Sequence, residues 1–471
     1  MRQAVWLTVM TVVLACCVHS ARTEGMAAAN DGPNAGPEPS IPSKVKFSVG
    51  KPETVISFER MKEADVRGID GSLYALNDKG QWKWFGTNLV KIVYSTGPRD
   101  NPLDHIVAKS ELQDLPDTYT DTRFGFAVDH RWGDGPTLAN VYLNPKNGHI
   151  LGFFHTEWTL QTKGGAYFRF GLGISKDGGK TFQWCGHILA THLSYETWLK
   201  HWRGVKKGGP FAWSNVGLAN YVVKDGYFYL YYTDTEDHPA TLVQGTAVAR
   251  AKVEDVLAAA ENLQAASWKK YHQGQWNEGG ISGKFTPLNI KPLGFLHGDS
   301  AYNSHLDRFV LVTRLGKYDD TPPEAPSKSS SILLSFSKDG IHWSDWQVMH
   351  EDNHLHDYPS IVSMGDDNEV VGKSFWVYYK YCFSNSRRSG SFAWSSAYGG
   401  WWRVFGTAVF GNGGDLATIG EAHGHARTEV RGRLRTPSPF LRGESPRKTS
   451  KISRRGMFAA RSSPARALGE R

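Results

Sequence analysis

Short apolar runs recur along the chain, and each begins at a turn residue and ends in polar residues. They are rich in aromatic and β-branched residues, which predicts strands. The five runs begin at Gly71, Gly148, Gly226, Asp307 and Gly372, which lie 77, 78, 81 and 65 residues apart. This spacing fits a repeated unit of several strands, which cannot bury its faces without neighbours. The pattern therefore predicts an all-β fold, a five-bladed β-propeller, whose ligand site lies where strand ends meet at the central axis.

The propeller is placed at residues 53–412. The segment that begins at Thr54 is predicted to be an early strand that completes the last blade and closes the ring. Strong helix formers at helical spacing, from Val253 to Ala266, predict a helical insertion on the surface between the third and fourth blades. The strand-like stretches after Ser391 and Trp401 are assigned to the outer part of the fifth blade.

The first 22 residues have the pattern of an export signal. The apolar stretch from Ala4 to Val18 follows Arg2 and is short for a membrane span. Two readings stay open: cleavage near Ser20, or a bacterial lipobox that places a lipid on Cys16. We expect a secreted, periplasmic or lipid-anchored protein at the cell envelope. Residues 23–52, rich in Gly, Pro, Ala and Asn, are expected to form a disordered spacer.

Charge is concentrated at the C-terminal end. The chain carries a net charge of +8, whereas residues 421–471 hold 13 Lys and Arg against 4 Asp and Glu. The rest is therefore close to neutral, which argues against a nucleic-acid-binding body. Residues 413–471 are expected to be a disordered basic tail, a non-native extension or an arm that binds an acidic polymer. Outside the signal only Cys185 and Cys382 remain, as two buried thiols or a pair across blades.

One turn motif supports the propeller. Residues from Ser175 to Phe182, with Asp177, Gly179 and Thr181 between them, match the Asp-box S-x-D-x-G-x-T-[WF] of sialidase-like propellers. Residues 337–343 are a shorter version. The Asp side chain bonds turn amides and Gly adopts positive φ, so the motif marks a hairpin between outer strands. It indicates fold and carries almost no information on chemistry.

Candidate chemistry lies at two repeated positions: the loop into the innermost strand of each blade, and the polar end of the second strand. In the first blade these are assigned to residues 63–65 and to Asp78. Carboxylates gathered at the axis would shift one another's pKa values, and glycoside hydrolysis needs one protonated carboxyl and one ionised carboxylate. The catalytic candidates are Glu157, Asp234, Asp299 and Asp357.

Other polar and aromatic residues at the same positions are candidates for binding substrate. They are His155, Trp213, Asn215, His297, Arg314, His356 and Lys380. The three histidines could orient a carboxylate, bind sugar hydroxyls or hold a metal, and each could equally be a core or surface histidine. The loop that contains Glu278 either covers the site or connects blades. No metal ligand is assigned.

The chain resembles the five-bladed propeller glycoside hydrolase superfamily of arabinanase- and xylosidase-like enzymes. The resemblance rests on the Asp-box, the ring of polar strand ends, and the phrases that begin at Tyr302 and Tyr358, and it spans residues 53–380. It implies an Asp base, a pKa-modulating Asp and a Glu acid from three blades, and a structural calcium in the channel by analogy with some relatives. The third blade departs from this pattern, because it carries Asn215.

These features favour a monomeric glycoside hydrolase that acts on a poly- or oligosaccharide. It would need no cofactor apart from the structural calcium. The alternatives are a non-catalytic carbohydrate-binding propeller and a structural module of the cell surface. A pair of carboxyl groups within catalytic distance in one pocket would distinguish the enzyme from the others.

Overall fold

A computed structural model describes residues 45–64, 71–88, 91–114, 118–121, 126–129, 135–159, 166–193, 216–237, 242–290, 297–315, 330–352, 355–382 and 400–410. Within them the fold is mostly β, as the sequence predicts, with two short helices, α1 (Phe58–Glu63) and α3 (Val253–Glu261). Neither helix is long and apolar enough to cross a membrane.

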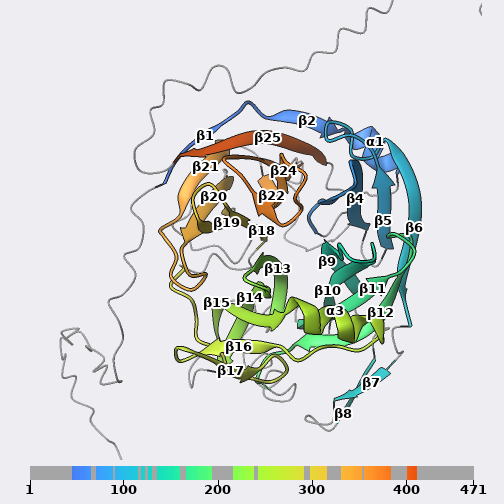
Figure 1. The fold of residues 1–471 in the computed structure, drawn as a ribbon, viewed down its shortest axis with the longest axis vertical. Helices are drawn as coiled ribbons and strands as arrows, with labels where there is room; N and C mark the ends of the chain where they lie inside the picture. Colours follow the sequence, from blue (N-terminus) through green and yellow to red (C-terminus); the bar gives the residue numbers. More distant parts are fainter. Residues whose placement is uncertain are drawn as a thin grey trace, which may run out of the picture. The chain divides into compact units, whose positions relative to one another are not determined.

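The described strands form one sheet of eight strands, three of five and a two-stranded hairpin. The eight-stranded sheet consists of two antiparallel units, so that the large sheets comprise five units (Figure 1). Unit 1 contains β3 (Tyr74–Asp78), β4 (Gln81–Asn88), β5 (Lys91–Thr96) and β6 (His105–Gln113). Unit 2 contains β9 (Gly135–Leu143), β10 (Ile150–Thr159), β11 (Ala166–Ser175) and β12 (Phe182–Leu189). The two units join where β12 pairs in parallel with β6 over two residues. A separate hairpin is formed by β7 (Thr118–Asp121) and β8 (Phe126–Asp129).

Units 3 and 4 repeat this order. Unit 3 contains β13 (Val216–Lys224), β14 (Tyr227–Asp237), β15 (Leu242–Lys252), β16 (Lys269–His272) and β17 (Gln275–Gly279). Unit 4 contains β18 (Gly298–Asn303), β19 (Arg308–Leu315), β20 (Ser330–Ser337) and β21 (Gln347–Asp352). The predicted helix α3 is present, but it lies between β15 and β16, inside unit 3 rather than between two units. The loop with Glu278 is likewise neither a cover nor a connection: it forms the outer hairpin β16–β17.

Unit 5 combines both ends of the described chain. It contains β22 (Leu355–Ser363), β24 (Ser374–Cys382) and β25 (Gly400–Phe410), and β25 pairs with β1 (Lys46–Val49) and β2 (Glu53–Ile56). The early strand predicted from Thr54 is thus β2. The sheet already begins at Lys46, ahead of the expected boundary at residue 53. The two-residue strand β23 (Val370–Val371), from the loop between β22 and β24, pairs in parallel with β18 of unit 4.

The first strands of the units form a closed ring. β3 contacts β9, β9 contacts β13, β13 contacts β18, β18 contacts β22, and β22 contacts β3. Figure 1 shows β9, β13, β18 and β22 gathered around one centre. Since the strands of a unit are antiparallel, the start of each first strand and the end of each second strand lie at the same end of the unit.

The core consists of separate clusters between successive units. In the described residues, five clusters occupy the interfaces between units 1 and 2, 2 and 3, 3 and 4, 4 and 5, and 5 and 1. Neighbouring residues of one strand point to opposite faces. Leu230 of β14 therefore joins the cluster shared with unit 2, while Tyr231 joins the cluster shared with unit 4. Buried, unpaired Cys185 belongs to the first of these clusters.

The turn from Ser175 to Phe182 fastens unit 2 to unit 1. Asp177 accepts hydrogen bonds from the Lys180 and Thr181 amides at 3.0 Å each and from the Thr181 hydroxyl at 2.6 Å. Gly179 has φ +105°, and a Cβ there would lie 2.7 Å from the Phe85 ring of β4. Glycine is required at this position both for its backbone conformation and for the close approach of the two units.

Gly179→Ala should therefore destabilise the fold more than a matched glycine substitution. Gly148 also has a positive φ, +76°, but a Cβ there meets nothing within 4 Å. We expect Gly148→Ala to cost about 1–2 kcal/mol of unfolding free energy from backbone strain. Gly179→Ala should cost about 1–3 kcal/mol more, from overpacking against Phe85. Urea denaturation of both variants measures the difference, and equal losses would contradict the packing role of the turn.

Candidate functional site

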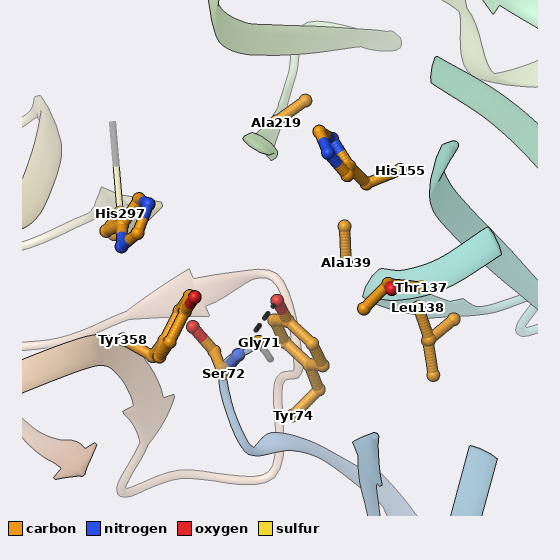
Figure 2. A pocket seen from close by; sticks show the side chains of 11 residues that line it. Gly71, Ser72, Tyr74, Thr137, Leu138, Ala139, His155, Ala219, His297 and Tyr358 are labelled. Carbon is orange, nitrogen blue, oxygen red and sulfur yellow. Dashed lines mark hydrogen bonds between the residues drawn. The ribbon is translucent and has the colours of Figure 1, made fainter. Parts of the chain in front are cut away.

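A cavity lies where the first strands converge, and residues from all five units line it (Figure 2). Gly71 and Ala219 bring the backbones of units 1 and 3 to its edge. Its polar and aromatic lining residues are Ser72, Tyr74, Thr137, His155, His297 and Tyr358. We call it the axial cavity. Since it is formed by the starts of first strands and the end of β10, it lies at the position where the sequence analysis places the chemistry.

One carboxylate holds an imidazole of this lining. Asp357 Oδ1 lies 2.7 Å from Arg314 Nε and 3.0 Å from His297 Nδ1. Asp357 and Arg314 are buried, and the His297 side chain is 12% exposed. Arg314 Nε and Nη2 also lie 3.2 Å from His297 Nδ1. A carboxylate oxygen only accepts and a guanidinium nitrogen only donates, so Nδ1 donates to Asp357 in one tautomer and accepts from Arg314 in the other. Asp357 and Arg314 together hold this edge of the imidazole, and Arg314 neutralises the buried charge.

Tyr358 covers the same imidazole. Its ring lies parallel to that of His297, with centroids 4.8 Å apart and planes inclined by 14°. Figure 2 shows the two rings side by side at the cavity edge, with Ser72 close to Tyr358. The imidazole is therefore restrained in its plane by Asp357 and on one face by Tyr358.

Asp299 connects three first strands. Its Oδ1 accepts from the Ser300 amide at 2.8 Å and from Asn140 Nδ2 of β9 at 3.3 Å, and its Oδ2 accepts from the Ile361 amide of β22 at 3.0 Å. Burial raises the pKa of Asp299 to about 7, although these three hydrogen bonds act in the opposite direction. Asp299 therefore holds units 2, 4 and 5 together where their first strands meet.

A second carboxyl is coupled to Asp299. Burial raises the pKa of Glu369 to about 8, and the charges of Asp367 and Asp299 add to the effect. The Tyr221 hydroxyl lies 3.2 Å from Glu369 Oε1 and 2.6 Å from the Val141 carbonyl. Glu369 is half-buried and comes just before β23. The sequence analysis missed it, because it lies in neither of the two repeated positions.

Asp234 lies in a buried ion pair. Its Oδ2 is 2.7 Å from Lys270 Nζ, both side chains are fully buried, and Lys270 also donates to the Ala190 carbonyl at 2.8 Å. Burial raises the pKa of Asp234 to about 6, against the opposing effect of Lys270. Asp234 is not among the residues that line the axial cavity. Asp234 is therefore connected through Lys270 to the Ala190 carbonyl, which follows the last strand of unit 2.

The remaining predicted residues fall into four groups. His155 lines the axial cavity and packs against Phe168 with ring centroids 4.6 Å apart. His356 is completely buried among Tyr379, Tyr381 and His350, and Lys380 is buried opposite Asp357 on β24. Glu157 is described only by its backbone, which pairs with Gly135 and Phe168 near the end of β10. Trp213 and Asn215 lie outside the described residues.

The assignment in the first unit was wrong. The apolar run after Gly71 is the first strand, β3, not the second, so Asp78 ends β3 and forms an ion pair with Lys83 at 2.8 Å. Glu63, placed at the loop into the innermost strand, ends helix α1 instead. Ser72 and Tyr74 lie at the start of β3, which the alignment took for a second strand. These two lining residues were missed for this reason.

The described residues contain no group of three or more His, Cys, Asp and Glu that could hold a metal ion. The calcium that the resemblance implies stays a prediction, because Ca²⁺ is also bound by carbonyl oxygens and water. The chemistry available at the axial cavity is that of an oriented imidazole, hydroxyl groups and aromatic faces.

No protein-family model matches this chain, and no curated protein matches it. Among solved structures, it is similar to the catalytic domain of the GH62 α-L-arabinofuranosidase from Coprinopsis cinerea, with 11% identity and a TM-score of 0.40 over 78% of this chain and 98% of that one. It is also similar to Zg3597, a family 117 glycoside hydrolase from Zobellia galactanivorans, with 9% identity and a TM-score of 0.37 over 77% and 84%. A third is an α-L-arabinofuranosidase from Lactobacillus brevis, with 11% identity and a TM-score of 0.41 over 74% and 90%.

Removing the partner of Asp234 should destabilise the protein strongly. Lys270→Met leaves a buried carboxylate uncompensated, which typically costs about 3–5 kcal/mol. Its matched control is Lys252→Met, which breaks the exposed 3.8 Å pair with Glu254 and should cost less than about 1 kcal/mol. Urea denaturation measures both. Adding Asp234→Leu to Lys270→Met should restore most of the loss, and equal stability of the two single variants would contradict the structural role of the pair.

The raised carboxyl pKa values give stability an unusual pH dependence. A carboxyl with a higher pKa in the folded than in the unfolded state binds more protons when folded, so the free energy of unfolding falls as pH rises between the two values. For Asp234, Asp299 and Glu369 this interval runs from about 4, the ordinary carboxyl value, to about 6, 7 and 8.

We therefore expect the free energy of unfolding, measured in urea, to decrease from pH 5 to pH 8. The double variant Asp299→Asn with Glu369→Gln should show a flatter profile, because two of the three titrating groups are then absent. A wild-type stability that rises over this range would contradict the assigned directions of the pKa shifts.

Proposed function

We propose that this chain is a glycoside hydrolase that cleaves a poly- or oligosaccharide at the axial cavity of a five-bladed β-propeller. The observation that carries the proposal is the imidazole of His297, which lines the cavity and is held by Asp357. The propeller itself is supported by the five sheet units, the ring of contacts among their first strands and the five interface clusters. The resemblance of the sequence to the propeller glycoside hydrolase superfamily supports the reaction class.

Sugar recognition would use the lining of the cavity. Aromatic faces stack on the apolar faces of sugar rings, and Tyr74 brings one such ring to the cavity edge. Hydroxyl and imidazole groups of Ser72, Thr137 and His155 offer hydrogen bonds inside the cavity. The cavity has a volume of about 10 Å³, the space of a single water molecule, so it would take the attacking water or one sugar hydroxyl while the sugar ring lies at its mouth.

The reaction needs a base and an acid. His297 would act as the general base in the tautomer whose Nδ1–H donates to Asp357, so that Nε2 takes a proton from the attacking water. The Asp357 carboxylate would stabilise the imidazolium that forms, and Arg314 would keep that carboxylate in place.

The acid that protonates the leaving oxygen would be Glu157. Its backbone lies two residues beyond His155 on β10, at the cavity end of unit 2. Asp234 and Asp299 are better explained by their structural bonds to Lys270 and to neighbouring first strands.

A non-catalytic carbohydrate-binding propeller is the second candidate. It is favoured by one observation: the described side chains of Asp234 and Asp299 serve internal bonds rather than line the cavity.

The sequence patterns add three further parts to the proposal. The protein would be exported, with either cleavage near Ser20 or lipid attachment at Cys16. It would be a monomer, and residues 175–182 would form an Asp-box.

Hydrolysis assays on a panel of plant, algal and host glycans test the proposal. Wild type should release sugar, while His297→Gln, Asp357→Asn and Glu157→Gln should each lower kcat about 10²- to 10⁴-fold, the usual range for losing a proton-transfer group. The matched controls His305→Gln and Glu254→Gln change exposed residues and should keep wild-type rates.

The two candidate functions predict different outcomes. Binding on a glycan array without release of sugar from any glycan would favour the non-catalytic propeller. Full activity in folded His297→Gln would exclude the imidazole as the base.

A further inference from the structure

We propose that Tyr358 is a positioning residue whose strained backbone holds its ring against His297 and so fixes the direction of the imidazole. The effect of Tyr358 on the reaction rate rests on the proposed function. The orientation of the His297 ring is a property of the protein without any ligand.

The backbone of Tyr358 is in an unusual conformation. Its φ is +48°, in the left-handed region that glycine and asparagine tolerate and bulky side chains avoid. The next residue is Pro359, which further restricts the residue before it toward extended conformations. Tyr358 lies inside β22, where the pairing with β24 shifts register between Asp357 and Ser360. A bulge of this kind redirects a side chain out of the regular alternation of the strand.

Neighbouring bonds hold the strained residue in place. The Tyr358 amide donates to Asp357 Oδ1 at 3.0 Å, the same oxygen that His297 and Arg314 contact. After the bulge, the Ser360 hydroxyl donates to the Leu73 carbonyl of unit 1 at 2.8 Å. The strain is therefore fixed from both sides, by the carboxylate that binds the imidazole and by the neighbouring unit.

The chain could have avoided this strain. A glycine or asparagine at the bulge would adopt the same backbone at lower cost. The chain instead carries a tyrosine that is 7% exposed and whose ring lies parallel to that of His297. The need for this ring beside His297 explains why a strained backbone is kept at this position. With Asp357 and Arg314 in contact with Nδ1 and Tyr358 covering one face, the His297 ring loses its freedom to turn, and Nε2 points in one direction.

Two substitutions separate the ring from the backbone. Tyr358→Phe keeps both the ring and the strain, whereas Tyr358→Asn keeps the backbone conformation and removes the ring. Gln273→Asn is a matched control, because Gln273 also has φ +48° but lies in the exposed turn of the outer hairpin β16–β17.

Nitrogen NMR of the His297 ring in the ligand-free full chain is the primary measurement, with the signal assigned by its loss in His297→Gln. Wild type, Tyr358→Phe and Gln273→Asn should show one set of ring signals. Tyr358→Asn should show averaged or doubled ring signals. Averaged signals in wild type, or a single unchanged set of signals in Tyr358→Asn, would overturn the assignment. If Tyr358→Asn does not fold, Tyr358→Leu, which keeps an apolar side chain but removes the aromatic face, should show the same averaged or doubled signals, and an unchanged spectrum of that variant would overturn the assignment.

Rates on a cleaved glycan give the second readout. Tyr358→Asn should lower kcat about 10- to 100-fold, the scale of a misplaced catalytic group, and the control Gln273→Asn should retain the wild-type kcat. A kcat unchanged in Tyr358→Asn would overturn the effect on rate. If wild type cleaves no glycan while the NMR result is as expected, the proposed function fails and the positioning of His297 stands.

Discussion

The structure depends on the burial of both faces of each sheet unit by its two neighbours. The consequence is visible in single strands: Leu230 and Tyr231 follow one another in β14, yet they pack into clusters on opposite sides of unit 3. A sheet with two apolar faces has no stable edge unit, so the row of units must close on itself. β1 and β2 meet this requirement by pairing with β25, which joins the two ends of the described chain in unit 5.

Closure brings the starts of the first strands to one place, and their polar groups must then be satisfied there. Asp299 accepts from amides of two units and from the Asn140 side chain of a third, and these bonds hold the centre of the ring together. Asp234 of the second strand β14 is paired instead with Lys270 of the fourth strand β16, because a buried charge without a partner is costly. A carboxylate near the axis of a ring of this kind is therefore not evidence of catalysis by itself.

The sequence predicted much of this arrangement. Runs rich in aromatic and β-branched residues and bounded by turn residues predicted the strands β10, β14, β19 and β24. The entry positions aligned from two of these runs fall at the start of β18 and within β22. The first unit was misassigned because its first strand is as apolar as the second strands of the others. Local patterns could not reveal that Lys270 pairs with Asp234, 36 residues away, or that Tyr358 has a positive φ. Such features arise from long-range packing.

The same packing connects the axial cavity to ring closure. Tyr358, which covers His297, belongs to the cluster between units 5 and 1, and that cluster also contains Ile56 of β2. Ser360, two residues further on, is bonded to unit 1 through Leu73. The restraint on the imidazole is thus maintained by the interface that the N-terminal strands complete. The geometry of the site therefore depends on closure of the ring as well as on the residues that line the cavity.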